Sequence, residues 1–136
     1  MTREEIRLAV VTLVETRKAT WSAYPLVIEY DNRILVDTQK QTNPFLCVSI
    51  VYISGEQLEL AGVNHRVWGQ VHVSAAVRVG EGSGKANELL DHFVPALHMR
   101  AISNLRLWGA SPVRDRPHLG WVYYPVLVPF EADNLV

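Results

Sequence analysis

The sequence predicts an α+β fold, a largely antiparallel mixed sheet with two helices packed on one face. Two stretches, one near the N-terminus and one between residues 86 and 97, place apolar residues at helical spacing. The central stretch Val67 to Val79 instead alternates apolar and mixed positions, as expected for an antiparallel strand with one covered face. Further strand-like runs flank these segments, so the predicted order is helix, strands, helix, strands.

Length and composition indicate one globular domain, residues 1–136, with a substantial core. The chain is 49% hydrophobic and 20% charged, which is ordinary for a folded protein. Its formal net charge of -1 argues against a dedicated nucleic-acid binder, which needs a strongly basic face. We recognise no signal peptide and no apolar run of the ~20 residues that span a bilayer. We therefore expect no membrane partner and synthesis in the cytosol.

The N-terminal helix is predicted to run from Arg3 to Lys18. Thr2 and Glu5 have the spacing of a capping box, in which each side chain accepts a hydrogen bond from the other residue's backbone N–H. Tyr24-Pro25 stops any helix, because a residue before proline avoids the α region. Leu26 to Tyr30 then has the composition of a short strand.

A polar segment, Asp37 to Pro44, separates this strand from the next and lacks periodicity. Long loops in compact domains tend to carry function, so this loop is a candidate functional segment. Phe45 to Ile53 is rich in β-branched and aromatic residues and is predicted to be a strand. We expect Ser54-Gly55 to turn it, followed by a short strand from Gln57 to Leu60 and a turn from Gly62 to His65.

The second helix is predicted from an apolar stripe that runs from Ala86 to Leu97. Ser83 precedes it and is a favourable N-cap residue. Pro95 lies inside the stripe, so it should kink the helix or end its first part.

The C-terminal part contains two weak strand candidates, Leu105 to Trp108 and Val113 to Arg116. Trp121 to Phe130 is predicted to be the final strand. Pro125 and Pro129 cannot donate to a ladder of hydrogen bonds, which predicts a position at the sheet edge. An aromatic edge strand can pair with a neighbouring chain, so this strand is also a candidate interface.

A glycine-rich turn before the second helix resembles a phosphate-binding loop. Gly84-Lys85 matches its end, but the pattern needs a glycine at the position of Val79 and a hydroxyl at that of Ala86. Glu81 would also place a negative charge beside a phosphate. We therefore predict a flexible turn that starts a helix, and no nucleotide cofactor.

Residues for catalysis or metal binding do not form a convincing pattern. The five histidines have no i, i+4 pair that would place two ligands on one helix face. The single cysteine, Cys47, lies in an apolar run and is expected to pack as a small hydrophobe. No Gly-x-Ser-x-Gly elbow is present. We predict no catalytic residue, no metal and no enzyme activity.

Several short motifs, in order, resemble those of the phage tail terminator family, the minor tail proteins of long-tailed phages. The resemblance covers the chain from about Ile6 to Phe130, and each motif is weak by itself, whereas their order and spacing are more specific. The motifs are Tyr24-Pro25, Tyr30-Asp31-Asn32, Asn43-Pro44-Phe45-Leu46, a strand containing Gly69, the turn Val79 to Gly84, a helix with Ala86, Leu90 and Phe93, and Gly120-Trp121.

The resemblance implies an α/β structural protein of the virion that forms a hexameric ring on the head-proximal end of the tail tube. Such a ring ends tube polymerisation and offers a surface to the head–tail connector protein, while DNA passes through its lumen. Its partners would be the tail tube protein, the connector and other copies of itself. The candidate interface residues are Arg33, Gln39, Lys40, Gln41, Arg114, Arg116, Trp121 and Tyr123.

Three alternative functions stay open at this point. Another neck or head–tail joining protein can share this size and fold. A nucleotide-binding module would use the loop from Gly80 to Lys85, and a thermal shift with ATP and magnesium would test it. A generic cytosolic binding domain would use the aromatic strand, and neighbouring genes would distinguish it from a tail protein.

Overall fold

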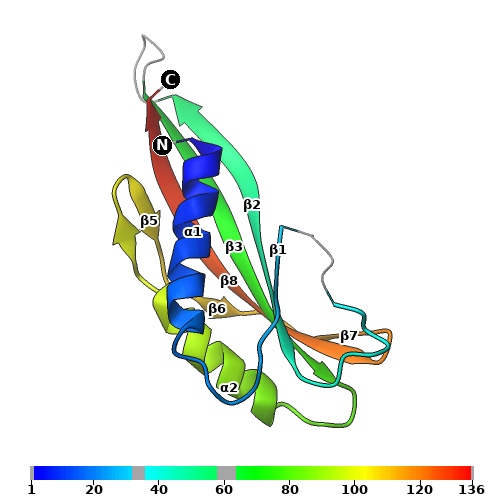
Figure 1. Cartoon of the computed structure of the whole chain (residues 1–136). Coiled ribbons are helices and arrows are strands. Elements are labelled where there is room, and N and C mark those ends of the chain that lie inside the picture. The colour runs from blue at the N-terminus through cyan, green and yellow to red at the C-terminus, as the bar shows by residue number, and fades with distance from the viewer. Residues whose placement is uncertain (1, 32–35, 58–63, 136) are drawn as a thin grey trace.

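The computed structural model describes residues 2–31, 36–57 and 64–135 (Figure 1). A three-residue 3-10 helix, η1, follows directly on the second α-helix. In chain order the elements are α1 (Arg3–Lys18), β1 (Ile28–Tyr30), β2 (Phe45–Gln57), β3 (Asn64–Arg78), α2 (Gly84–Phe93), η1 (Val94–Ala96), β4 (Ala101–Ile102), β5 (Leu105–Leu107), β6 (Ser111–Pro112), β7 (Arg116–His118) and β8 (Trp121–Leu135).

The sheet is mixed and mostly antiparallel, and both α-helices lie on one face of it (Figure 1), which confirms the predicted α+β fold. Its main strand order is β1-β2-β3-β8-β5-β4, with β6 and β7 also paired to β8. Among the strands of the described residues, β1 and β2 are the one pair that runs in parallel. The three long strands β2, β3 and β8 form the centre of the sheet. The short strands β1, β5, β6 and β7 pair with them, and the helices pack against them.

The first helix has the predicted bounds and the predicted capping box. The backbone N–H of Glu5 donates to Thr2 Oγ1 at 3.1 Å, and that of Thr2 donates to Glu5 Oε2 at 2.8 Å. The second helix also ends as expected, since α2 stops at Phe93 and Pro95 lies in η1. Ser83 occupies the N-cap position, but its side chain makes no capping hydrogen bond there.

The final strand is not at the sheet edge, and this prediction was wrong. β8 pairs with β3 along its whole length, from Trp121 to Leu135. On its other side it pairs with β7, β6 and β5 in turn. The carbonyls of Pro125 and Pro129 accept hydrogen bonds on that second side. Because the N and C=O of one strand residue point the same way, the missing N–H groups also face that side, between the short partner strands.

Two further boundaries differ from the sequence prediction. Ser54-Gly55 does not turn the chain, because β2 continues to Gln57 with a register shift between Tyr52 and Ser54. That shift is a β-bulge type of irregularity, in which one strand has an extra residue and pairing continues beyond it. The predicted strand Gln57 to Leu60 falls largely on residues 58–63, which lie outside the described residues, and the predicted turn up to His65 overlaps β3, which begins at Asn64.

The predicted strand Val113 to Arg116 is replaced by two shorter ones. β6 ends at Pro112 and β7 begins at Arg116, so the residues between them lie in neither strand. The predicted strand at Leu105 to Trp108 is confirmed as β5, and β4 forms a small hairpin with it.

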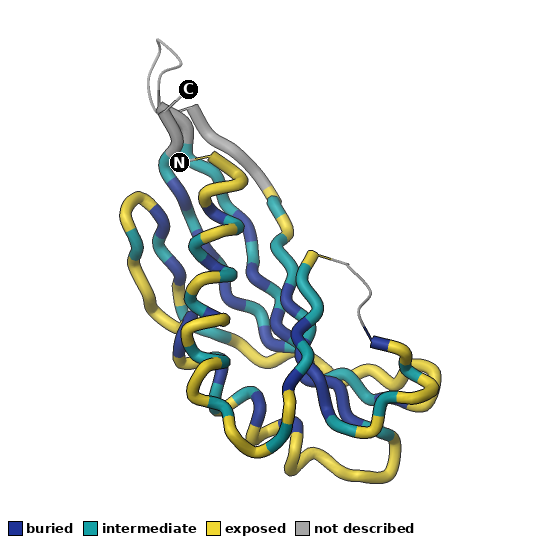
Figure 2. The backbone as a smooth tube through the Cα atoms, in the orientation of Figure 1, coloured by how far each residue is buried: buried dark blue, intermediate teal, exposed yellow. Residues whose placement is uncertain are grey.

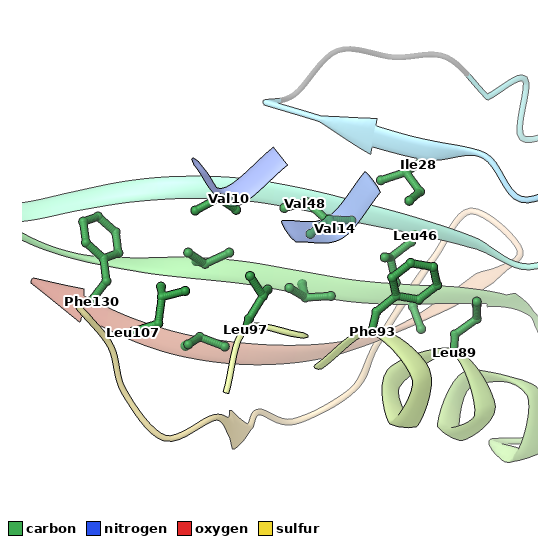
Figure 3. Close-up of a cluster of buried hydrophobic side chains, with 14 of the residues drawn as sticks. Val10, Val14, Ile28, Leu46, Val48, Leu89, Phe93, Leu97, Leu107 and Phe130 are labelled. Carbon is green, nitrogen blue, oxygen red and sulfur yellow. The ribbon is translucent and has the colours of Figure 1, made fainter. Parts of the chain in front are cut away.

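The main hydrophobic core lies between the helices and the sheet (Figure 3). Val10 and Val14 of α1 and Leu89 and Phe93 of α2 point onto apolar side chains of the central strands. The strand positions that face them alternate as predicted, with Val71, Val73, Ala75 and Val77 all buried. Among the described residues, neither helix has the length and apolarity that a membrane crossing requires.

Candidate functional site

A second, smaller hydrophobic cluster lies on the opposite face of the sheet, at the end where β8 begins. It consists of Val36, Phe45, Ala76 and Trp121. Neighbouring strand residues such as Leu46 and Ala75 belong to the main core, because successive side chains in a strand point to opposite faces. The small cluster therefore supports a separate part of the molecule.

That part consists of the loop 36–44 and the segment 111–120, which we call the end lobe. Figure 1 shows the loop and the β7–β8 hairpin extending together beyond the helices at one end of the sheet. Every residue from 111 to 120 is exposed (Figure 2). The end lobe contains all the described residues that were predicted as interface contacts, except the buried Trp121 and the adjoining Tyr123. Arg33 lies outside the described residues.

Trp121 anchors the end lobe instead of contacting a partner, which corrects the prediction that it is an interface residue. Its side chain is 0% exposed, and its ring meets that of Phe45 edge to face at 5.0 Å between centroids. The indole Nε1 donates to the carbonyl of Thr38 at 3.0 Å. A buried indole N–H needs such an acceptor, so this contact holds the loop against the sheet.

Arg78, the last residue of β3, fixes the same loop by its backbone carbonyls. The guanidinium donates to the carbonyl of Gln41 from Nη2 at 2.7 Å and from Nε at 3.2 Å, and to that of Gln39 at 3.3 Å. It also lies over the Trp121 ring at 4.8 Å from the centroid, a cation–π arrangement. Loop carbonyls that would otherwise need water are therefore bonded to a charged donor.

Contacts within the loop complete this arrangement. Asp37 caps a turn, because its carboxylate accepts from the N–H of Gln39 at 3.0 Å and its carbonyl from those of Lys40 and Gln41 at 3.1 and 2.8 Å. At the start of the loop, Glu29 Oε2 accepts from the N–H of Val36 at 3.0 Å. Gln39 and Lys40 remain exposed, so the loop presents them from a fixed backbone.

The other half of the end lobe carries the two predicted arginines. Arg114 and Arg116 are exposed, and neither forms an ion pair within the described part of the chain. Tyr123 is half-buried and packs edge to face on Phe45 at 6.2 Å. A hollow of about 360 Å³ lies beside it, lined by Arg116, Pro117, His118 and Tyr123.

The end lobe carries a small positive charge. Its charged residues are the cations Lys40, Arg114 and Arg116 and the carboxylates Asp37 and Asp115. Surface charges of one sign steer association with a complementary partner more than they add affinity. The end lobe is therefore suited to a surface that carries acidic groups.

Cys47 lies beneath the end lobe, in surroundings that disfavour its thiolate. Burial, followed by the neighbouring Glu29 carboxylate, raises the pKa of its thiol to about 12. The thiol donates to Glu29 Oε1 at 3.6 Å. A thiol with this pKa stays protonated near neutral pH, whereas reactive cysteines have lowered pKa values.

The glycine-rich turn lacks a free lysine for a phosphate. Lys85 Nζ lies 3.5 Å from Glu81 Oε2, an ion pair one helical turn apart. Gly80 and Gly82 have φ values of 93° and 79°, which explains why glycine occupies these turn positions. In the described ranges, His, Cys, Asp and Glu side chains form no group of three or more that could hold a metal ion.

Sequence reasoning missed the residues that fix the end lobe. Arg78 ends a strand whose register with Trp121 is a long-range pairing, so no local pattern identifies their contact. Phe45 was assigned only to a strand. Leu119, 80% exposed at the tip of the β7–β8 hairpin, was not singled out, although an apolar residue next to a turn glycine is a usable signal.

Comparison with known proteins supports the fold but assigns no family. No protein-family profile matches the chain, and no curated protein matches it. A solved structure whose designation states no function superposes with a TM-score of 0.69, covering 97% of this chain and 96% of that one. The two sequences are 16% identical. The α+β architecture is thus one that another protein adopts along nearly its whole length.

Proposed function

We propose that this chain is the terminator of a phage tail, a non-enzymatic structural protein that caps the head-proximal end of the tail tube as a ring. In this role it ends tube polymerisation and forms the surface for head attachment. The observation that carries the proposal is the end lobe, an exposed projection with exposed arginines and a lysine, held on the sheet by Trp121 and Arg78.

A ring protein needs contact surfaces that keep their shape before the partner arrives, because ordering a flexible loop on binding costs free energy. The end lobe meets this need, since its loop carbonyls are bonded to Arg78 and Trp121. The resemblance of the sequence motifs to the tail terminator family, from Ile6 to Phe130, points to the same role.

The proposed partners are other copies of this chain, six to a ring, the tail tube protein and the head–tail connector protein. DNA would pass through the lumen without sequence-specific contact, which agrees with a net charge of only -1. The protein would be made in the host cytoplasm and reside in the neck region of the virion tail.

Another neck or head–tail joining protein is the second candidate, because a rigid projecting interface on this fold suits both roles. The two roles differ in what their loss does to the particle. A terminator limits the growth of the tail tube, whereas a joining protein attaches a finished tail to a filled head.

The test is tail length, measured by electron microscopy in lysates of the parent phage with a stop codon in this gene. Overlong, variable tails without heads are expected for a terminator. Normal-length tails separated from filled heads would identify a joining protein instead. Unaffected virions would contradict both roles and favour the cytosolic binding module.

A further inference from the structure

An apolar hollow of about 230 Å³ opens between α2 and the strands β6 and β8. Leu90 and Val94 line it from the helical side, and Ala110 and Val126 from the strand side. The exposed residues Asn87 and Asp91 stand at its rim on α2. A small apolar depression with a polar rim is the shape that receives one apolar side chain at a protein interface.

One large apolar side chain, that of Leu119, is unusually exposed to solvent. Leu119 is 80% exposed, the highest value among the exposed large apolar residues described. It stands at the tip of the β7–β8 hairpin, whose two turn residues, Leu119 and Gly120, have φ values of 49° and 84°.

The backbone at Leu119 is costly for a leucine. A two-residue hairpin turn with both φ values positive favours Asn, Asp or Gly at its first position. A non-glycine residue in this region costs of order 1 kcal/mol, and such strain concentrates at functional positions. The Leu119 side chain is thus exposed to water on a strained backbone. A pocket on a partner that takes up this side chain would give a reason for a leucine at this position.

Leu119 cannot reach the hollow of its own chain. The hairpin closes at the pair His118 and Trp121, whereas the hollow lies where Pro112 pairs with Val126. Five residues of extended strand separate the two positions on β8, about 16 Å at ~3.3 Å per residue. A second copy of the chain can bring them together.

The charges around the two features are complementary. Arg116 lies in β7, three residues before Leu119. Asp91 is exposed and lines the hollow. Neither Asp91 nor Arg116 forms an ion pair with any described residue.

We propose that Leu119 of one copy inserts into the hollow between α2 and β6 of the next copy, with Arg116 beside its Asp91. The two surfaces differ, so the contact is head-to-tail, and repetition closes a ring if the rotation between copies allows it. This inference rests on the proposed function, since it names the surface through which copies of a terminator ring meet.

Directional disulfide formation tests the contact. One batch of protein carries His118→Cys, which keeps the Leu119 side chain, and another carries Asn87→Cys, and the two are mixed at high concentration under mild oxidation. We expect the mixture to give a cross-linked dimer at least 10-fold more abundant than in either variant alone, because two copies meet tip to hollow. Cys47 contributes little, since its raised thiol pKa of about 12 keeps it protonated.

Met99→Cys mixed with Asn87→Cys is the matched control. Met99 is also an exposed apolar residue, at 61%, with a positive φ of 54°, but it lies outside the end lobe. Equal dimer yields in this control and in the test mixture would overturn the proposal, because they would show random collision.

The same pair of cysteines in one chain extends the test to tails purified from the phage. Only cross-linked dimers are counted, because an intrachain disulfide leaves the mass of the chain that of a monomer. No cross-link in both concentrated protein and tails overturns the contact. Normal tails in the stop-codon phage would instead overturn the terminator function, while a cross-link in purified protein would still establish the contact.

Discussion

The two faces of the sheet carry hydrophobic clusters of very different size and consequence. The cluster on the helix-covered face includes residues from both helices and five strands and is the core that makes the fold. The cluster on the other face has four buried members, all near the start of β8. The comparison shows that the large cluster determines whether the chain folds, whereas the small one determines where the end lobe is held.

The clusters also differ in how polar groups enter them. At the small cluster the polar side-chain groups are hydrogen-bonded, since Trp121 and Arg78 both donate to carbonyls of the loop 36–44. In the large one, by contrast, Trp21 Nε1 and the Tyr24 hydroxyl are buried without a hydrogen-bond partner among the described residues. Substitutions in the two clusters should therefore separate global stability from the local order of the end lobe.

The largest effect is expected in the large cluster, at Phe93. Phe93→Ala removes a fully buried ring that packs against Trp21, and should lower the free energy of unfolding by about 3–5 kcal/mol. Urea unfolding followed by fluorescence measures it. A loss below about 1 kcal/mol would contradict the assignment of Phe93 to the core.

Gly69→Ala should lower the free energy of unfolding by about 1–3 kcal/mol, because it adds a methyl group where the core has no room. A Cβ atom at Gly69 would lie 2.3 Å from the carbonyl oxygen of Val51 and 2.6 Å from Cζ of Phe130. The ring of Phe130 thus occupies the space that a side chain would need. The same urea titration applies, and Gly84→Ala is the control, because no atom lies within 4 Å of a Cβ there.

Trp121→Phe should have a small effect on global stability and a clear effect on the order of the loop 36–44. It keeps an aromatic ring but removes the hydrogen bond to Thr38, which should lower the free energy of unfolding by about 1 kcal/mol. Amide hydrogen exchange at Lys40 and Gln41 should become roughly 10-fold faster, because the loop loses an anchor. Trp108→Phe, at a ring that is 46% exposed, should change neither quantity. Unchanged exchange in Trp121→Phe would contradict the anchoring role.

Alkaline destabilisation is the last expected effect, and residues packed against both clusters contribute to it. The folded pKa values of Cys47 and Tyr24 are raised to about 12, mainly by burial, from ordinary values of 9.0 and 10.0. The unfolded chain therefore releases these protons first, so stability is complete below about pH 9 and declines as pH rises toward 12. Urea unfolding at about pH 8 and about pH 10.5 measures the decline, which Cys47→Ala should reduce. A decline of the same size in Cys47→Ala would show that the thiol does not contribute.

Local signals predicted the parts of the fold that local chemistry determines. The capping box fixed the first helix at Arg3–Lys18, and Pro95 ended the second as expected. The alternation from Val67 identified β3. The position of β8 could not be predicted in this way, because Pro125 and Pro129 suit an edge but also suit a strand whose second side pairs with several short strands.

The candidate site was predicted only in part for the same reason. Gln39, Lys40, Gln41, Arg114 and Arg116 do lie in one exposed lobe. Their common location depends on the pairing of β3 with β8, which brings Arg78 beside Trp121 and beneath the loop. Such pairings join residues more than forty positions apart, and a single sequence gives no measure of them. The aromatic strand, expected at the sheet edge, therefore suggested a partner contact at Trp121, where the structure has an anchor.

Complementation of the stop-codon phage with variants of the end lobe tests the role of the lobe most directly, with tail length measured by electron microscopy. Arg114→Glu combined with Arg116→Glu changes the exposed charge of the lobe, and Lys85→Glu combined with Arg100→Glu makes the same change in charge elsewhere. Overlong tails are expected with the first variant and normal tails with the second. Normal tails with both variants, each folded as judged by urea unfolding, would contradict the claim that the end lobe carries the function.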